Sequence, residues 1–117
     1  MSTELKQLGQ VFPETTEPVK VYSPERAVTG IVRSVIVCNV TDQEAKFSIF
    51  CDLNGETFDP STALYYGVVL KPSETRELSN FIPMHRQSAS FAVQSSVPKA
   101  INFTISGVEQ KANEIRV

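Results

Sequence analysis

The sequence predicts an all-β fold, an antiparallel β-sandwich of about seven to eight strands with extended N- and C-terminal arms. Three observations support this prediction. Apolar and polar residues alternate in several short segments, turn-forming residues separate these segments, and no long stretch has helical periodicity. Jelly-roll and immunoglobulin-like topologies both fit the pattern. The chain contains no tryptophan, so it lacks the buried tryptophan of antibody domains.

The segments 27–40 and 45–53 are the most apolar of the chain, and a polar turn at residues 41–44 separates them. We expect them to form a β-hairpin around which the other strands are organised. The proposed register places Cys38 opposite Phe47 and Ile36 opposite Ile49, so apolar side chains meet apolar side chains. The alternation puts five residues of the second strand on the core face: Ala45, Phe47, Ile49, Cys51 and Leu53.

Further strands are expected before and after this hairpin, at residues 19–22, 63–70, 74–78, 88–94 and 100–106. Gly30 predicts a bulge or bend through which the long strand passes from one sheet to the other. The 63–70 segment places Leu64, Tyr66, Val68 and Leu70 on one face. The 74–78 segment is charged, which predicts an exposed or edge strand. The expected core residues of the last two strands are Phe91, Val93, Ile101, Phe103 and Ile105.

Three regions are expected along the chain. Residues 1–18 form a polar N-terminal arm, because Pro13 and Pro18 discourage regular structure. Residues 19–108 form the β-sandwich domain, and residues 109–117 form a tail, either a second arm or a short helix. We expect the arms to reach neighbouring subunits.

Composition argues against several kinds of partner. Eleven Lys and Arg residues and thirteen Asp and Glu residues are scattered along the chain, without the basic cluster that binds nucleic acid. No apolar run reaches the roughly 18–20 residues of a membrane helix, and the first residues lack the pattern of a secretory signal. We therefore expect no nucleic-acid partner, no membrane partner and synthesis in a cytoplasm.

The two cysteines are predicted to be free, buried thiols. In the proposed register Cys38 and Cys51 lie four positions apart, on the order of 13 Å, whereas a disulfide needs Cα atoms within about 7 Å. Two cysteines without a second pair or nearby histidines supply half of a tetrahedral metal site. No metal is therefore expected.

Catalytic residues and cofactors are not expected either. His85 is the single histidine, and neither Ser88 nor Ser90 beside it lies in a nucleophile elbow. The chain has no Gly-rich phosphate loop and no evident pair of facing carboxylates. We expect a protein that is not an enzyme.

The candidate functional residues are apolar side chains expected on the surface. Phe12, Phe50 and Tyr65 fall on the face opposite the expected core, and Leu8 and Ile115 lie in the two arms. These five residues form a candidate subunit interface. A carbohydrate-binding module is the alternative of a different class, with Tyr65, Tyr66 and Asp59 as its candidate ligand contacts.

Four segments carry a resemblance to a known family: Leu8-Gly9-Gln10, Val21 to Pro24 followed by Ala27-Val28, Val35 to Asn39, and Phe103 to Glu109. With these segments the chain resembles the small β-sandwich virion proteins of tailed bacteriophages. The resemblance covers most of the chain and rests on strand and turn residues. The charged segment 74–77 departs from the family, whose members have a middle richer in glycine and alanine.

The resemblance implies a non-enzymatic virion structural protein. It implies a capsid decoration or cement protein that forms a homo-oligomer, with a homotrimer as the expected state. Its partners would be copies of itself and major capsid or tail proteins. The protein would be made in the cytoplasm of a host bacterium and reside in the virion. A tail, baseplate or fibre component is the alternative within the same class.

Overall fold

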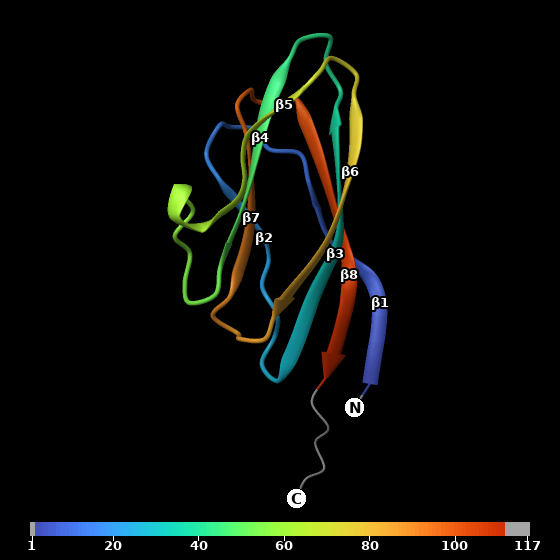
Figure 1. Ribbon diagram of the computed structural model, residues 1–117, viewed down its shortest axis with the longest axis vertical. Coiled ribbons are helices and arrows are strands. Elements are labelled where there is room, and N and C mark those ends of the chain that lie inside the picture. Colours follow the sequence, from blue (N-terminus) through green and yellow to red (C-terminus); the bar gives the residue numbers. More distant parts are fainter. Residues whose placement is uncertain (1, 112–117) are drawn as a thin grey trace, which may run out of the picture.

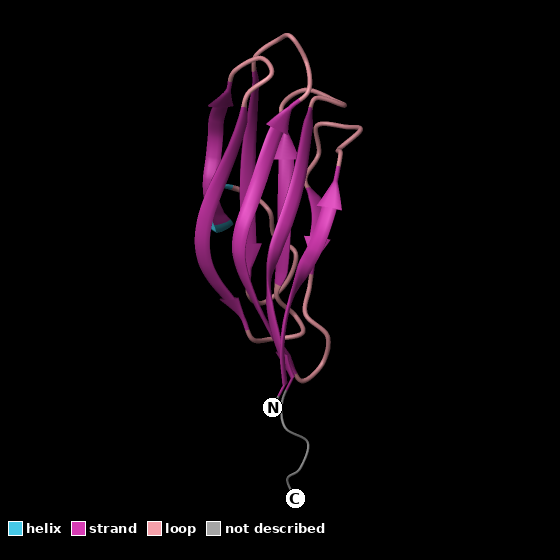
Figure 2. Cartoon of the chain, turned by 90° about the vertical axis from the view of Figure 1, so that its right-hand side faces the viewer, coloured by secondary structure: helices cyan, strands magenta, loops and turns pink. Residues whose placement is uncertain are grey.

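The computed structural model describes residues 2–111, and of Ser2 the backbone alone. It consists of eight strands and one short 3-10 helix, η1, at Pro60–Thr62. The strands are β1 Ser2–Val11, β2 Val19–Tyr22, β3 Val28–Asn39, β4 Ala45–Asp52, β5 Ala63–Leu70, β6 Thr75–Met84, β7 Ser90–Ser95 and β8 Ile101–Lys111. Two layers of strands are visible in Figure 2. The predicted all-β sandwich is confirmed.

Each layer is an antiparallel sheet of four strands. Sheet A has the order β1-β8-β3-β6, and sheet B has the order β2-β7-β4-β5. The pairs are nested along the chain, because β4 pairs with β5, β3 with β6, β2 with β7 and β1 with β8. Figure 1 shows that β3, β8 and β1 continue downward past the end of sheet B.

The expected hairpin between residues 27–40 and 45–53 is wrong. β3 belongs to sheet A and pairs with β8 and β6, whereas β4 belongs to sheet B and pairs with β7 and β5. The segment between them therefore crosses from one sheet to the other. As a result Val35 and Val37 are buried in the middle of β3, whereas Ile36 is 38% exposed.

Asn39 holds this crossing in place. Its side chain is buried, and Nδ2 donates hydrogen bonds to the carbonyl oxygens of Gln43, at 2.8 Å, and of Leu70 and Lys71, both at 3.2 Å. Oδ1 accepts from the backbone N–H and the hydroxyl of Thr41. The amide of Asn39 thus provides hydrogen-bond partners for backbone carbonyl and N–H groups at the crossing between the sheets.

Both cysteines are free, as predicted, although not for the predicted reason. Cys38 lies in sheet A and Cys51 in sheet B, so they are not members of one hairpin. Each is half-buried, so the expectation of full burial is wrong.

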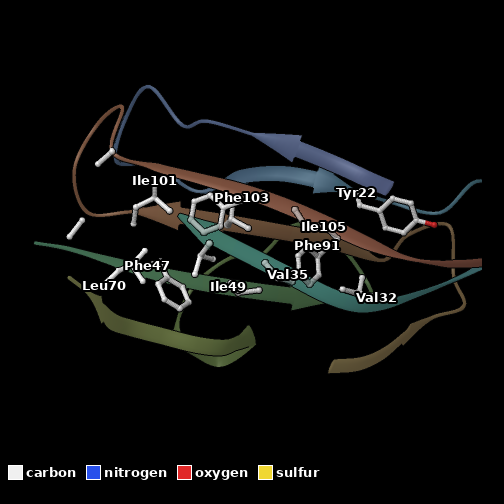
Figure 3. Close-up of a cluster of buried hydrophobic side chains, with 14 of the residues drawn as sticks. Tyr22, Val32, Val35, Phe47, Ile49, Leu70, Phe91, Ile101, Phe103 and Ile105 are labelled. Carbon is white, nitrogen blue, oxygen red and sulfur yellow. The ribbon is translucent and has the colours of Figure 1, made fainter. Parts of the chain in front are cut away.

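The core fills the space between the sheets, and Figure 3 shows its main side chains. The rings of Phe47 in β4 and Phe103 in β8 meet edge to face across it, with centroids 6.4 Å apart and planes at 75°. The predicted core residues of the last two strands are all fully buried: Phe91, Val93, Ile101, Phe103 and Ile105. The predicted face of residues 45–53 is correct for Ala45, Phe47 and Ile49 and for Cys51, which is half-buried against the core, whereas Leu53 is exposed.

Both expected arms contribute strands. Residues 2–11 of the expected N-terminal arm form β1 at the edge of sheet A, and β8 continues through residues 109–111 of the expected tail. β1 pairs with β8 along its whole length, so it satisfies backbone groups that would otherwise form an open edge of the sheet. The rest of the expected tail, residues 112–117, lies outside the described residues.

Gly30 has a different role from the one predicted. The bulge of β3 lies between Val32 and Ser34, and β3 remains in sheet A throughout. A Cβ atom on Gly30 would collide with the ring and hydroxyl of Tyr22. Glycine at this position therefore lets a tyrosine of sheet B pack against the backbone of sheet A.

Gly67 changes the alternation of β5. It adopts a left-handed conformation, with φ of 61°, at a bulge where Tyr66 and Gly67 lie opposite Ser48. Tyr65 therefore points into the sandwich and Tyr66 points outward, with 60% of Tyr66 exposed. The prediction that Leu64, Tyr66, Val68 and Leu70 share one face is wrong.

The charged segment at residues 74–78 belongs to β6, an edge strand of sheet A, as predicted. β6 is longer than predicted, since it continues through Pro83 to Met84. An edge strand tolerates Pro83 because the missing N–H is not needed by a second neighbour.

Candidate functional site

The face of sheet A that points away from the core is the first candidate site, and we call it the outer A face. The side chains of β6 and β8 alternate regularly between inward and outward along the strands. Among the outward side chains of the sheet A strands within residues 3–111, Arg33 and Glu77 are charged, and the others are neutral. The Ser34 hydroxyl donates to Glu77 over 3.0 Å, and the Arg33 guanidinium lies 5.9 Å from the centre of the Phe81 ring.

A row of apolar side chains crosses the outer A face. Leu5 in β1 lies opposite Val108 in β8, Val108 lies opposite Ile31 in β3, and Ile31 lies opposite Pro83 in β6. Phe81 stands beside this row. Leu5 is 80% exposed and Phe81 is 68% exposed. The row spans the whole width of the sheet, and contiguous exposed apolar surface of this kind marks interaction sites.

The structure does not bring the five predicted interface residues together. Leu8 is half-buried against the core and Phe12 is 41% exposed just after β1, whereas Phe50 and Tyr65 belong to sheet B. Ile115 lies outside the described residues.

Two of the predicted exposed aromatics are not exposed. Phe50 does point away from the core, but Phe58 and Tyr66 pack against its ring, at centroid distances of 6.3 and 6.5 Å, and it is 1% exposed. Tyr65 packs against the core, and its hydroxyl donates to Oδ1 of Asn80 over 2.9 Å. The prediction of surface exposure is wrong for Phe50, and Tyr65 is half-buried on the opposite side of the sheet from the predicted one.

The apolar row was missed because residues 1–18 were interpreted as an arm and residues 27–40 were expected to pair with residues 45–53, so Leu5, Val108 and Ile31 were not expected side by side. The signal was present in the alternation of Thr3, Leu5 and Gln7 and of Ser106, Val108 and Gln110. The neutral outward residues of these two segments could therefore have suggested a covered surface.

The outer face of sheet B holds a second candidate site, a groove of about 440 Å³ that opens to solvent. Its lining includes Glu17, Lys46, Ser48, Tyr66 and Gln94. The 13–18 loop forms one side and is held by two hydrogen bonds. Gln94 Nε2 donates to the Thr16 carbonyl, and the Lys99 N–H donates to the Pro13 carbonyl, each over 2.9 Å.

A charged network lies at the end of the sandwich where sheet A extends past sheet B. Glu109 accepts a hydrogen bond from Tyr22 over 2.6 Å and pairs with Lys6 over 3.2 Å. These two contacts lower the pKa of Glu109, with the Tyr22 hydrogen bond as the larger cause. Burial is the main cause that raises the pKa of Tyr22. The network joins β1, β2 and β8.

The residues considered for catalysis are not organised around one centre. His85 is exposed in the loop after β6, Ser88 donates to the Leu53 carbonyl, and Ser90 is buried. Between residues 2 and 111, no group of three or more His, Cys, Asp or Glu side chains is arranged to hold a metal ion. In the same part of the chain, no helix has the length and apolar character needed to cross a bilayer.

Comparison with known proteins does not assign this chain to a family. No protein-family model and no curated protein sequence matches this chain. The outer A face and the groove on sheet B are therefore the surfaces that bear on function.

Proposed function

We propose that this chain is a non-enzymatic virion structural protein, a capsid decoration or cement protein that assembles with copies of itself on the phage head. One observation supports this most strongly. The outer A face is almost free of charge and carries an exposed apolar row from Leu5 to Pro83. The buried centre of a protein interface is likewise depleted in charged residues.

The size of the outer A face suits a subunit contact. β8 has 11 residues, which corresponds to a length of about 36 Å, and four strands are about 19 Å wide. The face therefore covers about 700 Å², close to the roughly 800 Å² that each partner contributes to a stable interface. A second copy of this chain can supply the matching neutral surface, so we propose a second copy as its occupant.

The strand order favours a jelly roll over an immunoglobulin-like sandwich. In the immunoglobulin fold the first two strands are neighbours in one sheet, whereas β1 and β2 here lie in different sheets. A jelly roll has eight strands in two sheets and occurs in viral capsid domains. The nested pairing of β1 with β8 through β4 with β5 fits that description. This supports a structural role by analogy of fold alone.

Two kinds of assembly can cover the face. Two copies can pack their outer A faces together as an isologous dimer, or each face can pack on a different surface of the next copy in a closed ring. The trimer expected from the resemblance belongs to the second kind. Because every copy keeps its own fold in both arrangements, the number of copies is a separate measurement from the use of the face.

Antibody labelling of purified phage particles tests the location. An antibody against the full chain is expected to decorate heads in negative-stain electron microscopy. Labelling confined to tails or baseplates would replace the head assignment by the tail alternative. Unlabelled particles, together with a chain that stays monomeric in solution, would overturn the proposal.

A further inference from the structure

The groove on the outer face of sheet B combines an exposed aromatic ring with polar side chains, and we propose that it binds a glycan. Its volume of about 440 Å³ falls within the roughly 300–1,000 Å³ of small-ligand sites. It lies on the opposite sheet from the outer A face. A protein attached through sheet A would therefore present this groove to solvent, so the inference goes beyond the structural role.

The ring of Tyr66 is fixed in an outward orientation in which a ligand can reach it. The bulge at Gly67 turns Tyr66 away from the core, and its ring is 60% exposed. The buried ring of Phe50 meets it edge to face, with planes at 73°. A ring that is supported in this way loses little freedom when a ligand stacks on it, which favours binding.

Polar groups around Tyr66 match the hydroxyls of a sugar, each of which can donate and accept hydrogen bonds. Lys46 and Glu17 line the same groove, and neither takes part in an ion pair with any residue between 2 and 111. Ser48 Oγ accepts from the Gly67 N–H over 2.9 Å, which leaves its own hydrogen free to donate. The groove therefore offers donors and acceptors around one aromatic face.

Other ligand classes fit this lining less well. One lysine and one glutamate of opposite charge do not favour a phosphate, and a lining in which Tyr66 is the one large apolar side chain does not favour a lipid. A peptide strand would add to the free edge of β5, beside the groove, because β4 in the middle of the groove is paired with β5 on one side and β7 on the other. The apolar C–H face of a pyranose ring can stack on Tyr66 while its hydroxyls reach the polar groups.

Of the three residues considered from sequence for a glycan site, the structure keeps one in the groove. Tyr65 points inward, and Asp59 caps η1 by accepting from the Ser61 N–H over 2.8 Å. Tyr66 remains, joined by residues of β4, β7 and the 13–18 loop that are distant in sequence.

A printed array of oligosaccharides tests the proposal with the full chain. The array includes neutral hexoses, N-acetylhexosamines and uronic acids, and the best-bound oligosaccharide is then titrated by calorimetry. We expect Tyr66→Ala to weaken binding about tenfold or more and Tyr66→Phe to retain most of it, since the aromatic face remains. Leu64→Ala, in the same strand but outside the groove, is the matched control and is expected to bind like the wild type.

Binding that disappears with Tyr66→Ala and persists with Leu64→Ala supports the glycan site. Absence of binding by the wild-type chain across the array would overturn it, as would equal binding by the wild type and Tyr66→Ala. Because this groove and the outer A face lie on different sheets, sedimentation of the same samples reports separately on self-association. Failure of one proposal is therefore distinguishable from failure of the other.

Discussion

The hydroxyl of Tyr22 in β2 donates a hydrogen bond of 2.6 Å to Glu109 Oε2 in β8 and thereby joins sheet B to sheet A. The contact depends on Gly30, because the Tyr22 ring occupies the space that a side chain at that position would fill. A short strand of four residues is thus fixed against the longer sheet by one polar contact and one close approach.

Tyr22→Phe is expected to lower the free energy of unfolding by about 1–2 kcal/mol. The substitution removes the donor and leaves a largely buried carboxylate without this hydrogen bond. Urea denaturation followed by circular dichroism measures the change. Tyr66→Phe is the control, since Tyr66 is exposed, and an equal stability of wild type and Tyr22→Phe would show that the contact contributes nothing.

Acid is expected to remove the contribution of Glu109. Its pKa in the folded protein is lowered below the ordinary value of 4.5, so its ionised form stabilises the fold above that pH. This contribution is lost as the pH falls through the lowered pKa. Chemical denaturation of wild type and Glu109→Gln at a series of pH values should show a stability difference that is constant near neutrality and shrinks in acid. A difference that grows in acid would contradict the sign.

Gly30→Ala is expected to destabilise the fold by about 1–3 kcal/mol, because the added methyl group overlaps the Tyr22 ring. Gly55→Ala provides a matched control in the turn after β4, where the nearest atom to an added Cβ is Asp52 Oδ2 at 3.4 Å. The melting temperatures of the two variants compare them directly. Equal melting temperatures would mean that Tyr22 moves aside without cost.

Asn39→Ala is expected to cost about 2–4 kcal/mol of unfolding free energy. The buried amide donates to three carbonyl oxygens and accepts from Thr41 at the crossing between the sheets, and alanine leaves these groups without partners. Guanidinium denaturation measures the loss. Asn102→Ala is the comparison, since Oδ1 of Asn102 is buried without a hydrogen-bond partner; a smaller effect at Asn39 than at Asn102 would contradict this role.

Alternation and turn residues predicted the bounds of several strands well. β2 and β5 have the predicted boundaries, and the inward residues of β8 follow period two from Ile101 to Ile105. The same rule failed at Tyr65 and Tyr66, because the left-handed conformation of Gly67 shifts the alternation by one residue. An isolated glycine within a strand signals such a bulge, but it does not say which side chains point inward.

The pairing of the strands was harder to predict from the sequence than their bounds. The expected hairpin register paired apolar residues such as Cys38 with Phe47 and Ile36 with Ile49. The chain between β3 and β4 nevertheless crosses between sheets, and the partners of β3 are β6 and β8. Partners so distant in sequence leave no local signal. The outer A face was missed for the same reason, since Leu5 and Val108 become neighbours only when the chain ends pair. The groove likewise joins β4, β5, β7 and a loop before β2.

Sedimentation velocity of the full chain tests the central claim that the outer A face is a contact between copies. Leu5→Glu places a charge in the apolar row, and because Leu5 is 80% exposed the substitution should leave the fold intact. Leu64→Glu introduces the same change at an exposed leucine of sheet B, where 46% of the residue is accessible. We expect an oligomeric wild type, a shift of Leu5→Glu towards the monomer, and a Leu64→Glu variant that sediments like the wild type. A wild type that is monomeric at every concentration, or a Leu5→Glu variant as associated as the wild type, would contradict it.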